Sequence, residues 1–102
     1  MKWNELLAAG AFAAIAGSSH AQPMDTLQVR SLAASCANCH GTLGVAEVGH
    51  ESLAGVSKDD LLKKMMDFKT GKKPATLMHQ LSNGYTDDEL AALAGYFSAL
   101  KK

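Results

Sequence analysis

The chain has only two cysteines, two prolines and few aromatic residues, and its acidic and basic side chains balance to a formal charge of zero. With two cysteines, a structural zinc site would lack the second pair of ligands that such a site ordinarily needs. Without an excess of basic residues, nucleic acid is not an expected partner. The sequence therefore points away from zinc modules and nucleic-acid-binding proteins.

Strand patterns and linkers are also missing. No segment shows the period-two alternation of apolar and polar residues that marks a half-buried strand. No internal repeat, low-complexity segment or long Pro/Ser/Gly tract divides the chain. We therefore expect one small all-α domain, whose apolar core would be marginal without further support.

The most specific feature is Cys36-Ala37-Asn38-Cys39-His40. Two thiols in this spacing can each bond to one vinyl group of a haem, and the histidine that follows can ligate the iron. A redox dithiol should follow a strand in a βαβ pattern, and no such strand precedes Cys36. A disulfide across two residues would close a very short loop and contribute little stability. We therefore predict one covalent haem c on Cys36 and Cys39, with His40 as an axial ligand.

Residues 1–21 are expected to be a secretory signal peptide. Lys2 supplies a positive start, Leu6 to Gly17 form an apolar run, and Ser19-His20-Ala21 is a small-x-small cleavage site. An uncleaved membrane anchor or a buried helix is the alternative, although the run is short for a bilayer span. Cleavage after Ala21 would leave residues 22–102 as the haem domain, in the periplasm and without a permanent membrane anchor.

Three helices are expected in that domain. The first runs from about Asp25 to Ser35, the second begins at Ser57 and ends near Gly71, and the third opens with the capping box Thr86-Asp87-Asp88-Glu89. The apolar residues expected to face the core are Leu27, Leu32 and Ala34 in the first helix, Leu61, Leu62, Met65, Met66 and Phe68 in the second, and Leu90, Leu93, Ala94, Phe97 and Leu100 in the third.

A second axial ligand should come from later in the chain. Met65 and Met66 lie on the apolar face of a predicted helix, where methionine is usually a packing residue. Met78 follows Pro74 in a stretch expected to be an irregular loop, which would let its thioether reach the iron. His79 would point the opposite way in an extended segment, and His50 is a further candidate. We favour Met78 and interpret His79 as a surface or supporting histidine.

On these residues the chain resembles a class I cytochrome c, with C-x-x-C-H after the first helix, a methionine loop and a last helix bearing Tyr96-Phe97. The resemblance implies that the first and last helices cross in close contact. It also implies that a backbone carbonyl accepts a hydrogen bond from His40 Nδ1. The family commonly has a proline at the residue carrying that carbonyl, whereas this chain has Glu51 in Glu51-Ser52-Leu53-Ala54-Gly55.

A narrower resemblance is to the haem subunits of flavocytochrome c sulfide dehydrogenases. Its most specific element is Pro74-Ala75-Thr76-Leu77-Met78-His79-Gln80, and Gly84-Tyr85-Thr86-Asp87-Asp88-Glu89 extends it. This resemblance implies a flavoprotein subunit as electron donor, with the sulfur chemistry carried out on the flavin. The cytochrome would then have no catalytic site of its own.

Three functions remain open at this point: a haem subunit that accepts electrons from a flavoprotein, a free-standing periplasmic electron carrier, and a gas- or peroxide-binding haem protein with a displaceable Met78. The first two need a six-coordinate iron and the third an open position. The lysines between residues 58 and 73 are interpreted as a solvated helix face, with a basic rim for an acidic partner as the alternative.

Overall fold

The computed structural model describes residues 24–102, and within that range it contains four helices and no strand. They are α1 (Thr26–His40), α2 (Lys58–Thr70), α3 (Leu77–Asn83) and α4 (Asp87–Ser98). The all-α prediction is confirmed. The predicted signal peptide, residues 1–21, lies outside the described residues, and among residues 24–102 no helix has the length and apolarity that a bilayer span requires.

Three of these helices begin after a residue whose side chain caps the N-terminus of the helix. Asp25 accepts a hydrogen bond from Gln28 N and starts α1, while Ser57 Oγ accepts one from Asp60 N and starts α2. At α4 the predicted capping box is present: Thr86 Oγ1 accepts from Glu89 N at 3.1 Å, and Glu89 Oε1 accepts from Thr86 N at 2.9 Å. These bonds satisfy amide groups that have no partner within the helix.

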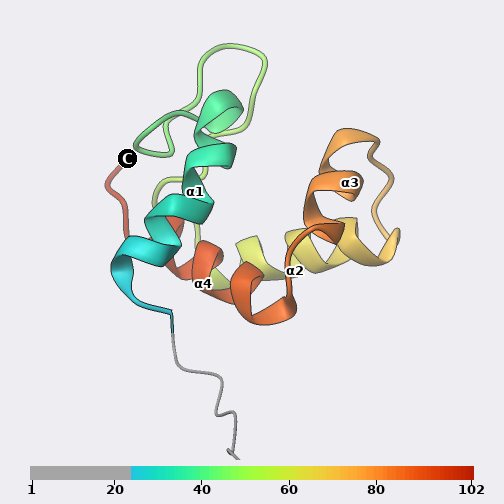
Figure 1. The fold of residues 1–102 in the computed structure, drawn as a ribbon. Coiled ribbons are helices and arrows are strands. Elements are labelled where there is room, and N and C mark those ends of the chain that lie inside the picture. Colours follow the sequence, from blue (N-terminus) through green and yellow to red (C-terminus); the bar gives the residue numbers. More distant parts are fainter. Residues whose placement is uncertain (1–23) are drawn as a thin grey trace, which may run out of the picture.

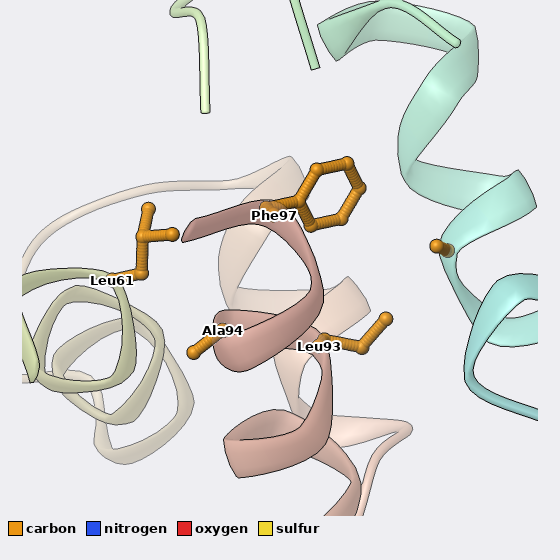
Figure 2. Close-up of a cluster of buried hydrophobic side chains, with 5 residues drawn as sticks. Leu61, Leu93, Ala94 and Phe97 are labelled. Atoms are coloured by element: carbon orange, nitrogen blue, oxygen red, sulfur yellow. The ribbon is translucent and has the colours of Figure 1, made fainter. Parts of the chain in front are cut away.

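The core is built on α4, which packs against both α1 and α2. Leu90, Leu93, Ala94 and Phe97 are buried, as their i, i+3, i+4, i+7 spacing predicts. Figure 2 shows Leu93 and Phe97 extending toward α1, while Ala94 faces Leu61 of α2. The contact that the resemblance implied between the first and last helices is therefore confirmed.

The inner face of α1 differs from the prediction. Leu27 is 71% exposed and Ala34 is exposed, while Val29 and Ala33 are buried and Leu32 is only half-buried. The buried pair continues the line of Cys36 and His40, because residues 29, 33, 36 and 40 follow one another at steps of three and four. One stripe of α1 thus serves both the packing on α4 and the C-x-x-C-H motif.

Between α1 and α2, residues 41–57 form a loop without regular structure that closes over the end of α1 (Figure 1). Its anchor is Gly44, whose carbonyl accepts hydrogen bonds from Leu53 N and Ala54 N at 2.7 and 3.0 Å. Gly44 has a φ of +75°, and a Cβ there would lie 3.1 Å from Phe97 Cδ1. The loop can therefore lie directly on α4 only because this residue has no side chain.

Figure 1 shows α1 and α3 at opposite ends of the molecule, with α2 and α4 running between them. The short helix α3 packs on α2 and lies in the segment that was expected to be an irregular loop. The sequence carries no strong signal for it, since Thr76 makes no side-chain capping bond and the helix has only seven residues. Its stability must come from contacts with α2 rather than from local propensity.

Candidate functional site

The C-x-x-C-H motif forms the last turn of α1. The helix does not end near Ser35, as expected, but continues through Cys36 and Cys39 to His40, and Gly41 ends it with a φ of +86°. A helical turn places residues i, i+3 and i+4 on one face, so both thiols and the imidazole project to the same side. Burial raises the pKa of the Cys36 thiol, an effect that its hydrogen bond with Ser35 partly offsets.

The orientation of His40 is fixed by the loop. Its Nδ1 lies 2.5 Å from the backbone carbonyl oxygen of Glu51. A carbonyl can only accept, so Nδ1 carries the proton and Nε2 of the neutral ring is left with a free lone pair. The carbonyl contact implied by the resemblance is therefore present, with glutamate in place of proline.

The side chain of Glu51 makes a second contact. Its Oε1 accepts a hydrogen bond from Lys64 Nζ of α2 at 2.6 Å. This bond to Lys64 is the main cause that lowers the pKa of the Glu51 carboxyl, with burial opposing it. Nothing in the sequence pattern predicts the pair, because its members are 13 residues apart and belong to different elements.

Met78 lies in the first turn of α3, half-buried, rather than in a loop. It lines a cavity of about 260 Å³ whose wall also contains Cys36, Cys39 and His40. The cavity is therefore bounded by the end of α1 and by α3, the two helices that stand apart in Figure 1. The other apolar side chains in the wall are Leu53, Leu61, Met65, Phe68, Leu77, Leu81, Leu93, Ala94 and Phe97.

These residues fit haem c. Two thiols stand at the spacing required for two thioether bonds, and one imidazole has its Nδ1 held by a carbonyl, which leaves Nε2 available to a metal. A thioether lines the wall from another helix, and the rest of the surface is largely apolar, as a macrocycle requires. A redox dithiol would need neither this apolar cavity nor a methionine in its wall.

The other candidate ligands are placed differently. His79 does not line the cavity; its Nδ1 donates to Phe68 O at 2.6 Å, and its Nε2 lies 3.3 Å from Asn83 Nδ2. Both ring nitrogens are thus engaged, in line with its interpretation as a supporting residue. Met66 is also absent from the cavity wall, whereas Met65 and the exposed His50 are part of it.

The sequence also provides no indication of a second polar contact in the cavity wall. Tyr85 Oη and Ser35 Oγ lie 2.6 Å apart and join α1 to the turn before α4. Lys69 Nζ donates to the carbonyl of Tyr85 at 2.8 Å and to Asp87 at 2.7 Å, which fixes the same turn to α2. The two partners of the hydroxyl pair are 50 residues apart, so no local pattern could have indicated it.

Half of the lysines in the lysine-rich segment are paired with carboxylates of the chain. Lys63 pairs with Asp67 at 2.7 Å, and the bonds of Lys64 and Lys69 are those already described. Lys73 Nζ lies 5.2 Å from the centre of the Phe68 ring, a cation–π distance. Three of the six lysines between residues 58 and 73 are therefore in ion pairs within the chain.

Comparison with known proteins agrees with the resemblance found in the sequence. No family model matches the chain. It is 35% identical over 81 residues to the cytochrome subunit of sulfide dehydrogenase from Chlorobaculum tepidum, covering 79% of this chain and 74% of that protein. It is 33% identical over 75 residues to cytochrome c-553 of Helicobacter pylori, covering 72% of this chain and 78% of that protein.

A longer relative is cytochrome c4 of Pseudomonas aeruginosa, 35% identical over 88 residues, of which this chain spans 43%. The chain belongs to the class I cytochromes c. It carries covalently bound haem c, and its function is electron transfer.

Proposed function

We propose that His40 and Met78 are the two axial ligands of the haem iron, with Cys36 and Cys39 as its covalent attachments. The observation that carries this proposal is the single cavity into which these four residues are gathered from α1 and α3. The haem supplies a one-electron Fe(III)/Fe(II) couple when bound. His40 binds through Nε2 while Glu51 holds Nδ1, and the thioether of Met78 favours the ferrous state relative to a second histidine.

The protein's residues also control access to that couple. The apolar wall limits the access of water to the site, so little solvent must reorganise when the charge of the iron changes, and the activation barrier for electron transfer is lowered. Part of the wall is nevertheless at the surface, since Leu77 is 57% exposed and Leu81 is 41% exposed. Electrons can therefore enter and leave where these two side chains of α3 meet solvent.

The electron donor we propose is a flavoprotein sulfide dehydrogenase subunit. This rests on the relative from Chlorobaculum tepidum, which is the cytochrome subunit of a sulfide dehydrogenase and aligns with most of both chains. The exposed Leu77 of α3, with Ala75 before it, would contribute the apolar part of the contact surface. A stable complex of this kind buries at least about 1,000 Å² in total.

Sulfide-dependent haem reduction tests this assignment. The cytochrome and a flavoprotein sulfide dehydrogenase subunit would be co-expressed and passed through gel filtration at low and high salt. Co-elution under both conditions, with sulfide reducing the haem faster than in the cytochrome alone, supports the subunit role. Elution of the cytochrome alone, with no flavoprotein-dependent reduction, would leave a free-standing carrier.

A matched pair of variants tests the proposed surface. Leu77→Glu places a charge beside the cavity mouth, whereas Leu27→Glu places one on a comparably exposed leucine in the first turn of α1. We expect only Leu77→Glu to slow the flavoprotein-dependent reduction. Equal effects of the two substitutions would contradict the assignment of this surface.

The proposal includes export. Residues 1–21 would direct the chain to the periplasm, where haem attachment takes place. They would be removed by cleavage after Ala21. Intact-mass measurement of the periplasmic holoprotein should then give a chain that begins at Gln22. A mature protein that retains Lys2 and the apolar run after it would contradict the proposal and favour an uncleaved anchor.

A further inference from the structure

Glu51 makes two contacts with different parts of the molecule. Its backbone carbonyl accepts the hydrogen bond of His40 Nδ1, while its carboxylate accepts one from Lys64 Nζ of α2 at 2.6 Å. A force on the Glu51 side chain is therefore transmitted through only a few bonds to the carbonyl that orients His40. Lys64 itself lines the cavity.

The loop around Glu51 has few other restraints. Ala46 N donates to Ser52 Oγ at 2.8 Å and His50 N to Glu47 O at 3.2 Å, so these bonds hold the loop only to itself. Gly49, two residues before Glu51, has a φ of +98°, and nothing lies within 4 Å of the position that a Cβ would take there. Among the hydrogen bonds and ion pairs of residues 24–102, the Lys64 contact is the one that ties residues 45–52 to α2.

We propose that the Glu51–Lys64 ion pair is a positioning device for the proximal ligand: it fixes the Glu51 carbonyl against His40 Nδ1 and so holds the imidazole in place under the iron. This inference rests on the proposed role of His40. It assigns a role to Lys64, whose hydrogen bond is to Glu51 and not to His40, and to the carboxylate of Glu51. Partners that hold the second nitrogen of a metal-bound histidine fix its orientation and raise its basicity.

The exposure of the pair favours positioning over stabilisation. The side chains of Lys64 and Glu51 are 33% and 59% exposed, and ion pairs at such sites contribute little to the free energy of unfolding. Breaking the pair should therefore leave the fold intact. What should increase is the fraction of time for which the hydrogen bond between His40 Nδ1 and the Glu51 carbonyl is broken.

Solvent exchange of the His40 Nδ1 proton measures that opening. In the oxidised holoprotein this proton should give a paramagnetically shifted NMR resonance, and we expect its exchange to become about 10-fold faster in both Lys64→Met and Glu51→Gln. The double variant should exchange no faster than either single variant, and Lys64→Arg should restore slow exchange. The control is Lys63→Met, which breaks the neighbouring Lys63–Asp67 pair on the same helix and should have no effect.

A purely electrostatic effect predicts a different pattern. Loss of a positive charge lowers the local concentration of hydroxide and slows base-catalysed exchange, while loss of a negative charge quickens it. Positioning predicts faster exchange in both variants. Opposite changes in Lys64→Met and Glu51→Gln, or no change in either, would overturn the inference.

The NMR spectrum of the unsubstituted holoprotein distinguishes a failure of the positioning role from a failure of the proposed ligand role of His40. If no paramagnetically shifted histidine Nδ1 proton exists before any substitution, His40 is not the ligand, and both proposals fail. If the resonance is present but its exchange is unaffected by the two variants, only the positioning role is wrong.

Discussion

The ring of His79 and the backbone carbonyl of Phe68 are joined by a hydrogen bond of 2.6 Å that connects α3 to the C-terminal end of α2. The bond lies one residue from Met78 and spans the Pro-containing stretch between the two helices. A histidine that sequence reasoning weighed as an iron ligand thus has a different task. It anchors the short helix that carries the methionine.

The first prediction follows from that anchor. In His79→Ala, α3 loses a hydrogen bond that contributes about 0.5–1.5 kcal/mol, so Met78 should be displaced from the iron at a lower concentration of guanidinium. The weak near-infrared band of methionine–iron ligation reports the displacement. Gln80→Ala, on the exposed neighbour, should leave the midpoint unchanged, whereas equal midpoints for His79→Ala and the parent would refute the anchoring role.

Gly44 gives the second prediction. In Gly44→Ala the new Cβ would lie 3.0 Å from Ala54 N and 3.1 Å from Phe97 Cδ1, at a residue whose φ is +75°. We expect the free energy of unfolding to fall by about 1–3 kcal/mol because of crowding and backbone strain together. Gly49→Ala is the matched control: its φ is also positive, at +98°, but nothing lies within 4 Å of the added Cβ. The loss should be smaller there, and equal losses in urea unfolding would exclude the crowding.

The third prediction concerns acid. The hydrogen bond from Lys63 lowers the pKa of Asp67 from its ordinary value of 3.8. As the pH falls, the Asp67 carboxylate is therefore protonated in the unfolded chain before it is protonated in the folded chain. The stabilisation is present above pH 3.8 and is lost as the pH falls through the lower pKa of the folded state. Asp67→Asn should lower stability near about pH 6 and make less difference near about pH 3.

Urea unfolding at both pH values measures that difference. In a Lys63→Met background, where the partner is gone, Asp67→Asn should have nearly the same effect at the two pH values. A pH dependence that persists without Lys63 would show that another group shifts the pKa.

The fourth prediction concerns the covalent bonds. Haem should stay with the chain after acid–acetone extraction, and the mass of the protein should include it. Cys36→Ala and Cys39→Ala should each remove one thioether bond, and the double variant should lose its haem on extraction. Met78→Ala is the control and should keep the haem mass, since the thioether of methionine forms no bond to the macrocycle. Haem that is freely extracted from the parent would contradict the site.

Much of the fold was predictable because its signals are local. The stripe from Leu90 to Phe97 and the capping box at Thr86 define α4 from its own residues, and the Ser57 cap and Gly71 do the same for α2. Two of the three residues predicted for the inner face of α1, Leu27 and Ala34, are exposed because they do not lie on the stripe shared with Cys36. Stepping backward from that cysteine by three and then four residues would have led to Ala33 and Val29.

The parts that escaped prediction depend on contacts between distant residues. The helix around Met78 has no side-chain capping bond of its own, and the bond from His79 to Phe68 O holds it against α2, so its seven residues look irregular in sequence. Glu51 makes two contacts: its backbone carbonyl accepts the hydrogen bond of His40 Nδ1, and its carboxylate accepts one from Lys64. Only the folded chain brings Lys64 to that carboxylate.

The near-infrared spectrum of the oxidised protein tests the central claim, that Met78 and His40 hold the iron between α3 and α1. The parent should show the weak methionine–iron band, and its ferrous form should not bind carbon monoxide readily. The band should be lost in Met78→Ala and kept in Met65→Ala, the other methionine of the cavity wall. A band that survives in Met78→Ala and disappears in Met65→Ala would contradict the account, and so would a parent that lacks the band and binds carbon monoxide.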